Sequence, residues 1–140
     1  MGYKKTYYFA MNSAAPGKEM DLMNDFIVGS GRIEERRELA IACEEAFMNI
    51  CDHAYEPNSP GPVMVIVRKG ARKITAVFID CGAFYNPLKG TLPVFYKERV
   101  GGQGLRIMRA YSRMKYIRLH GINILKLERK MPNGKIRRTH

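Results

Sequence analysis

The stretch EERRELAIACEEAFMNICDHAY, residues 34–55, carries the strongest helical pattern in this chain of 140 residues. Glu34 and Glu35 stand in its first turn, where the helix dipole favours acidic side chains. The run PNSPGP at 57–62 ends the pattern with a dense loop signal. The apolar residues between these ends recur mostly at intervals of four, which predicts a helix with one face against a core: Leu39, Ala42, Ala46, Ile50 and Ala54.

Shorter signals lie on both sides of this helix. Residues 18–28 have apolar positions spaced three and four apart and predict a second helix. A third, short helix is expected from Leu105 to about Ser112, after a stretch rich in Gly and Pro at 81–102. Runs of β-branched and aromatic residues predict five strands, the last four as two hairpins: 6–11, 63–67 with 74–79, and 115–120 with 122–127 around a turn at Gly121.

This order of elements predicts an α+β fold. Strands joined by short turns pair antiparallel, and helices that arrive in pairs cover one face of a sheet. We therefore expect a two-layer α/β sandwich with a mostly antiparallel sheet and helices on one face. The chain is long enough for one domain, assigned to residues 1–130, followed by a basic C-terminal tail at 131–140. Periodicity is already lost from Arg129 onward.

Several classes of protein are excluded. The sequence contains no run of eighteen apolar residues, the length that a transmembrane helix needs. The N-terminus lacks the apolar region of a secretory signal. The cysteines Cys43, Cys51 and Cys81 are odd in number and lack metal-ligand spacing, which argues against a disulfide framework and a zinc site. These features predict a cytoplasmic protein with no membrane partner.

Charge is divided unevenly along the chain, whose net charge is +11. Residues 1–60 hold 6 Lys and Arg against 10 Asp and Glu, whereas 61–140 hold 18 against 3. Arg106, Arg109 and Arg113 are spaced three and four apart and should share a face of the expected third helix. This basic half predicts either an acidic partner or a solvated surface.

Polar residues on the long helix could perform chemistry. Glu45, Asn49 and His53 are four apart and therefore lie on one helical face. A carboxylate at position 45 can accept a proton, and an amide oxygen at 49 suits a hard cation such as Mg²⁺. The alternative is an ordinary polar stripe that faces solvent.

Two glycine motifs could bind a ligand. Asp80-Cys81-Gly82 follows an apolar strand, and a carboxylate there can accept a hydrogen bond from an exocyclic amine. Gly101-Gly102-Gln103-Gly104 leads into a helix whose first N–H groups can bind phosphate. A simple turn and a flexible connector are the respective alternatives.

Together these motifs resemble the GHKL ATPase superfamily, in its anti-sigma-factor serine kinase branch. EEAFMNICDHAY at 44–55 is similar to the family's pattern E-E-A-x-x-N-x-x-x-H-A-Y. DCGAFYNP at 80–87 resembles D-x-G-x-x-F-D-P, with Tyr85 and Asn86 as departures, and GGQGL at 101–105 resembles G-G-x-G-L. GINIL at 121–125 is similar to the final hairpin, so the resemblance spans about Thr6 to Lys130 in family order.

The resemblance implies a role for each matching residue. Glu45 would be the catalytic base, and Asn49 would ligate Mg²⁺ beside the phosphates. Asp80 would accept a hydrogen bond from the adenine amine of ATP, and Gly82 would let the base approach. Gly102 and Gly104 would give N–H groups to the phosphates, and residues 89–99 would form a lid. Leu105 and Arg106 would belong to the same nucleotide-binding motif, where Arg106 is placed to neutralise the triphosphate.

The resemblance also implies partners, namely a sigma factor and a small anti-anti-sigma protein of the STAS type that the kinase phosphorylates. One alternative is a catalytically silent, ATP-gated module that binds a protein. A nucleic-acid binder is disfavoured because the chain has no recognised motif and no interleaving of aromatic and basic residues. A homodimer is left open.

Overall fold

The computed structural model describes residues 5–15, 17–89 and 103–132. Their helices are α1 (Lys18–Val28), α2 (Glu34–His53) and α3 (Gln103–Tyr111), with a single 3₁₀ turn, η1 (Pro87–Lys89). The strands are β1 (Lys5–Asn12), β2 (Pro62–Lys69), β3 (Lys73–Asp80), β4 (Arg113–Leu119) and β5 (Ile122–Lys130). No helix within these described ranges is long and apolar enough to cross a membrane.

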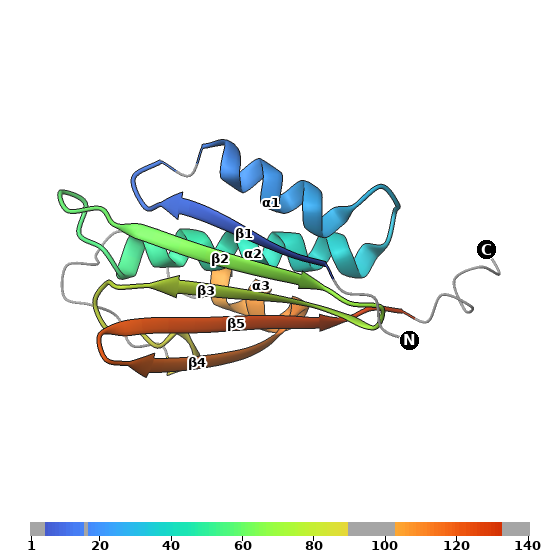
Figure 1. The fold of residues 1–140 in the computed structure, drawn as a ribbon. Coiled ribbons are helices and arrows are strands. Elements are labelled where there is room, and N and C mark those ends of the chain that lie inside the picture. Colours follow the sequence, from blue (N-terminus) through green and yellow to red (C-terminus); the bar gives the residue numbers. More distant parts are fainter. Residues whose placement is uncertain (1–4, 16, 90–102, 133–140) are drawn as a thin grey trace.

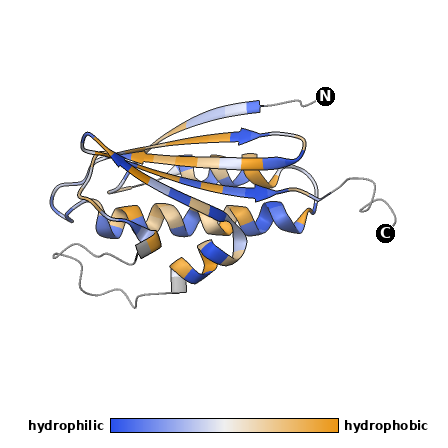
Figure 2. Ribbon diagram, turned by 90° about the horizontal axis from the view of Figure 1, so that it is seen from below, coloured by the Kyte–Doolittle hydropathy of each residue, from blue (hydrophilic) through white to orange (hydrophobic). Residues whose placement is uncertain are grey.

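The strands form one five-stranded sheet in the order β1-β2-β3-β5-β4, and each pair of neighbours is antiparallel. The three helices lie on the same face of this sheet (Figure 1). Seen from below, the sheet and the helices form two separate layers (Figure 2). The expected α+β sandwich is therefore confirmed.

The core lies between these two layers because side chains alternate along each strand. Val63, Val65 and Val67 of β2 point toward the helices and are fully buried, as are Ile74 and Phe78 of β3. The helices contribute fully buried side chains that recur at intervals of three and four: Met23 and Ile27 of α1, Leu39, Ala42, Cys43, Ala46 and Phe47 of α2, and Met108 of α3. The long helix α2 thus lies against the centre of the sheet, as its apolar pattern predicts.

Most boundaries differ from the sequence-based expectation by one or two residues, and three differences change the setting of a residue discussed above. His120 was expected in a strand but forms a two-residue turn with Gly121, at φ 50° and 78°; such turns suit the twist of a hairpin. Arg113 belongs to β4, since α3 ends at Tyr111, so it does not share a helical face with Arg106 and Arg109. Arg129 pairs with Ile74 inside the sheet and is not part of a loose tail. Residues 133–140 of the expected tail lie outside the described ranges.

Candidate functional site

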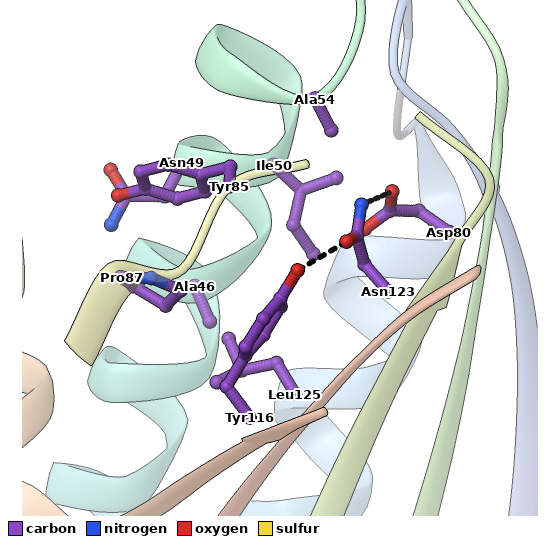
Figure 3. Close-up of a pocket in the computed structure, with 10 residues that line it drawn as sticks. All are labelled: Ala46, Asn49, Ile50, Ala54, Asp80, Tyr85, Pro87, Tyr116, Asn123 and Leu125. Atoms are coloured by element: carbon purple, nitrogen blue, oxygen red, sulfur yellow. Dashed lines mark hydrogen bonds between the residues drawn. The ribbon is translucent and has the colours of Figure 1, made fainter. Parts of the chain in front are cut away.

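A pocket opens between α2, the end of β3 and the β4–β5 hairpin (Figure 3). It spans about 290 Å³ with its open mouth included, and its enclosed part has room for about one water molecule. Tyr85 and Pro87 lie over one side of this space. The lining combines five apolar side chains with five that carry polar groups: Ala46, Ile50, Ala54, Pro87 and Leu125, and Asn49, Asp80, Tyr85, Tyr116 and Asn123.

Asp80 is the last residue of β3, and the strand's alternation turns its side chain toward the helices, where it is 3% exposed. Its Oδ1 accepts hydrogen bonds from Gly82 N at 2.9 Å and from Asn123 Nδ2 at 2.8 Å. Burial raises the pKa of this carboxyl, while the bonds from Asn123 and Gly82 and the nearby Arg118 guanidinium oppose that rise. Asp80 is thus a desolvated carboxyl held in one orientation.

Asn123 is the residue that orients Asp80, and the two are direct partners across β3 and β5. Its Nδ2 also donates to Ala83 O at 2.9 Å, so both amide hydrogens have acceptors. Its Oδ1 accepts from the Tyr116 hydroxyl and from Arg118 Nη1, the latter at 3.0 Å. Arg118 Nη1 also donates to Gly82 O at 2.9 Å. The β4–β5 hairpin therefore holds both Asp80 and the turn that follows it.

The sequence-based reasoning assigned no role to Asn123, Tyr116 or Arg118. A signal was present, because Asn123 is a polar residue at an inward position of a strand whose next inward residues are Leu125 and Leu127. Such a residue, when buried, must find hydrogen-bond partners. That its partner is Asp80 depends on the pairing of strands 43 residues apart.

Position 82 requires a glycine because its backbone packs closely against another segment of the protein. A Cβ added to it would lie 2.2 Å from the carbonyl oxygen of Ala54, just beyond the end of α2. Ala83 N donates to that same oxygen at 2.7 Å. The Tyr55 hydroxyl donates to Pro62 O at 2.7 Å and accepts from Cys81 N at 3.0 Å. The expected role of Gly82, approach of the adenine base, stays a prediction beside this structural one.

On α2, the polar stripe is not a solvated face. Asn49 is 6% exposed and lines the pocket, and His53 is 3% exposed with its ring centroid 4.3 Å from that of Tyr85. Glu45 is half-buried one turn before Asn49 and does not line the pocket. The helix therefore brings Asn49 to the same space as Asp80, with Glu45 beside it.

Residues 28–127 match the histidine kinase-like ATPase domain family. The chain belongs to this family. It is also 32% identical over 97 residues to the serine/threonine-protein kinase BtrW of Bordetella bronchiseptica (strain ATCC BAA-588 / NCTC 13252 / RB50), an alignment that covers 66% of this chain and 68% of BtrW. The matched range contains each residue of the candidate site, from Glu45 to Asn123.

In this ATPase domain the glycine motif leads into α3. Gly104 is buried in the first turn of α3, Leu105 is half-buried against the core, and Arg106 is exposed. Gly102 and most of the expected lid, residues 90–99, lie outside the described ranges. Gly104, Leu105 and Arg106 do not line the pocket. A link between the two regions exists, since Arg109 Nη2 donates to Leu88 O in η1 at 2.6 Å.

The residues present fit an adenine nucleotide chemically. Asp80 offers an acceptor deep in the pocket, and the first turn of α3 has backbone N–H groups without helical acceptors, which suit phosphate. In the described residues no three His, Cys, Asp or Glu side chains gather. A cation at Asn49 would therefore take further ligands from phosphate and water.

Proposed function

We propose that this chain binds ATP with Mg²⁺ in the Asp80 pocket and is a serine/threonine-protein kinase of the anti-sigma-factor type. Membership of an ATPase domain family supports ATP use, and the similarity to a serine/threonine-protein kinase supports phosphoryl transfer. The observation that carries the proposal is the geometry of Asp80. Its Oδ1 is held by two donors, which leaves its second oxygen to accept a hydrogen bond from a ligand.

This geometry favours adenine over guanine. Adenine carries an exocyclic amine that donates a hydrogen bond to a carboxylate. Guanine has a carbonyl oxygen at the same place, which would face the Asp80 carboxylate as one acceptor against another. A site built to bind a donor rejects an analogue that lacks it, because the buried acceptor is left unpaired. Apolar side chains of Ala46, Ile50 and Leu125 would contact the base from the α2 and β5 sides.

Transfer itself depends on α2. ATP would supply its γ-phosphoryl group and leave as ADP, and Asn49 would contribute an amide oxygen to the Mg²⁺ that neutralises the phosphates. Glu45 accepts the proton of a serine or threonine hydroxyl on the partner. The proposed partners are those of the resemblance, a sigma factor that is bound and an STAS-type anti-anti-sigma protein that is phosphorylated.

Calorimetry of ATP binding, with and without Mg²⁺, tests the nucleotide site. Asp80→Asn should weaken ATP binding about tenfold to a hundredfold, the amount that a hydrogen bond to a charged group contributes. Asp25→Asn, on the outer side of α1, is the matched control and should bind like wild type. Equal ATP affinity in wild type and Asp80→Asn, or a preference for GTP, would show that the site is assigned wrongly.

The raised pKa of Asp80 adds a pH dependence to the same measurement. ATP affinity of the wild type should fall as pH drops through this pKa, above the value of about 3.9 for an ordinary aspartate. The stability of the fold changes with pH in the opposite direction. Because the pKa of Asp80 is higher in the folded chain than in the unfolded chain, its protonation stabilises the fold at low pH, and this contribution is lost as pH rises. Asp80→Asn should therefore lose ATP affinity without losing thermal stability at pH 7.

A further inference from the structure

In the described part of the chain, three cationic side chains gather where α1, α2 and the β1–β2 pair meet. The end of α1, the start of α2, the start of β1 and the end of β2 lie at the same end of the molecule (Figure 1). Lys5 of β1 and Lys69 of β2 are direct partners across the two strands. Arg36 stands in the first turn of α2. Three separate elements therefore bring positive charge to one small region.

The backbone at Gly29, just after α1, is the point on which two of these charges converge. A Cβ added to Gly29 would lie 2.5 Å from Arg36 Nη1 and 3.7 Å from Lys69 Nζ. Both charged groups therefore lie beside the same turn of backbone. A larger residue at this position would displace the Arg36 guanidinium, so the absence of a side chain leaves the space to the two cations.

Lys69 is held in place by contacts with α1. Its Nζ donates to Phe26 O at 2.6 Å and lies 4.5 Å from the centroid of the Phe26 ring. The Phe26 ring packs in turn against the ring of Tyr7, with the two centroids 4.3 Å apart. An ammonium group has three N–H donors, so Lys69 can still donate to an anion from this fixed position.

The charge of Arg36 and Lys69 is not balanced inside the protein. No carboxylate in the described ranges forms an ion pair with either side chain. Desolvation lowers the pKa of Lys69, and so do the positive charges of Arg36 and Lys5. Arg36 Nε is buried and finds no hydrogen-bond partner among the described residues. Like charges placed opposite each other in a sheet and a desolvated cation both cost stability, and a bound anion would offset these costs.

We propose that Arg36 and Lys69, with Lys5 beside them, bind a phosphate dianion, either inorganic phosphate or a phosphate monoester. A phosphate monoester carries about −1.5 to −2 charges at pH 7 and three acceptor oxygens, so it can accept hydrogen bonds from both side chains at once. The planar guanidinium of arginine suits phosphate in particular. A carboxylate would balance only one of the cations. A nucleic-acid backbone is contacted by basic residues spread over a face or along a helix, whereas these surround a single turn.

This site is separate from the nucleotide pocket. Lys69 is at the opposite end of β2 from Val63, which pairs with Asp80. Because a strand rises about 3.3 Å per residue, the two sites are about 20 Å apart. The phosphate bound here is therefore not a phosphate of the nucleotide in the Asp80 pocket, and the proposal does not depend on kinase activity.

Thermal unfolding of the full chain in inorganic phosphate tests the proposal, with chloride at the same ionic strength as the reference. A ligand that binds only the folded state raises the unfolding midpoint, so phosphate should stabilise the wild type saturably. Arg36→Gln and Lys69→Met should each weaken phosphate binding about tenfold or more, the contribution of a hydrogen bond between charged groups. Arg37→Gln is the matched control, because Arg37 is the next residue of α2, is exposed, and lines a different groove with Asn24 and Ile41.

Far-UV circular dichroism checks that each variant is folded. Lys69→Met also removes the bond to Phe26 O, so Arg36→Gln decides the outcome if Lys69→Met is unfolded. A stabilisation by phosphate no larger than that by chloride overturns the proposal. So does a phosphate effect that survives Arg36→Gln, or one that Arg37→Gln abolishes.

A peptide that contains phosphoserine, compared with its unphosphorylated form, identifies the source of the phosphate. Binding of the phosphopeptide that is tighter than that of inorganic phosphate, and lost in Arg36→Gln, assigns the site to a phosphorylated protein. Binding of inorganic phosphate that is as tight or tighter, and equally dependent on Arg36, assigns the site to the free anion.

Discussion

Asp80 has the same chemical identity as any aspartate, yet its surroundings determine what it can do. Desolvation alone would favour the neutral form of its carboxyl. In that form one oxygen carries a proton, so the two oxygens cannot both accept hydrogen bonds from N–H donors. The donors Gly82 N and Asn123 Nδ2 and the guanidinium of Arg118 favour the charged form. Asn123 is in turn held by the Tyr116 hydroxyl. A single buried carboxyl therefore depends on a connected set of polar groups from β4, β5 and the turn after β3.

A substitution at Glu45 distinguishes an active kinase from a module that binds ATP without transferring phosphate. If it is the base, Glu45→Gln should reduce phosphoryl transfer to a serine or threonine partner by about a hundredfold to ten-thousandfold, the usual contribution of a general base. ATP affinity should be unchanged, because Glu45 does not line the pocket. Single-turnover transfer of labelled phosphate, together with calorimetry, measures both quantities.

Glu44→Gln is the control for that experiment, since Glu44 is the preceding residue and is exposed on another face of α2. Undiminished transfer in Glu45→Gln would remove this residue from the mechanism. Absence of transfer in the wild type, with ATP still bound, would favour the ATP-gated module that transfers nothing.

At the scale of elements, the end of α2 and the end of β3 are held together by close contact. Gly82 and Ala83 lie against the carbonyl of Ala54, and Tyr55 bridges Pro62 and Cys81. At the opposite end of α2, Arg129 Nη2 of β5 bonds Glu38 Oε1 at 2.8 Å. The helix that carries Asn49 is thus fixed at both ends relative to the sheet that carries Asp80.

Gly82→Ala tests this contact. The added methyl group overlaps backbone atoms that cannot move independently, so we expect a loss of about 1–3 kcal/mol of stability, the usual cost of overpacking. Thermal unfolding measures it, and the midpoint should fall by several degrees. Gly31→Ala is the control, because a Cβ there meets nothing within 4 Å. Unchanged stability with reduced ATP affinity would instead assign Gly82 to the approach of the base.

At the scale of the whole molecule, the positive charge has more than one role. Arg118 supports the Asp80 turn, and Arg129 binds Glu38 and donates to Tyr111 O at 3.0 Å. Other basic side chains, such as Arg106 on α3 and Arg113 on β4, are exposed and on separate elements. The exposed part of the charge is the part that could speed association with an acidic protein.

Filter binding to random duplex DNA and RNA distinguishes an acidic protein partner from a nucleic acid. We expect weak binding at low salt that disappears at physiological salt, because non-specific contacts release counterions and weaken with a slope of about −0.9 per phosphate. ATP should not alter it. Lysozyme, another small basic protein, provides a comparison of similar charge. Tight binding that persists at physiological salt would instead support a nucleic-acid function.

Much of the fold could be predicted from local patterns. The helix at 18–28 has the predicted bounds, and the long helix ends two residues earlier than expected. The five strands appear along the chain in the order that the sequence predicts. Spacing of apolar residues is set by the geometry of the helix or strand itself, so it can be read within a single segment. The family motifs, too, are short and local, and family membership is confirmed.

Contacts between distant segments could not be read in this way. The pairing of Asp80 with Asn123 and the approach of Gly82 to Ala54 both depend on register between segments far apart in the chain. Register is set by the packing of the whole sheet against its helices, and a one-residue shift would turn each side chain to the other face. The sequence by itself therefore determined which elements and motifs exist, and only the tertiary structure decided which of their side chains meet.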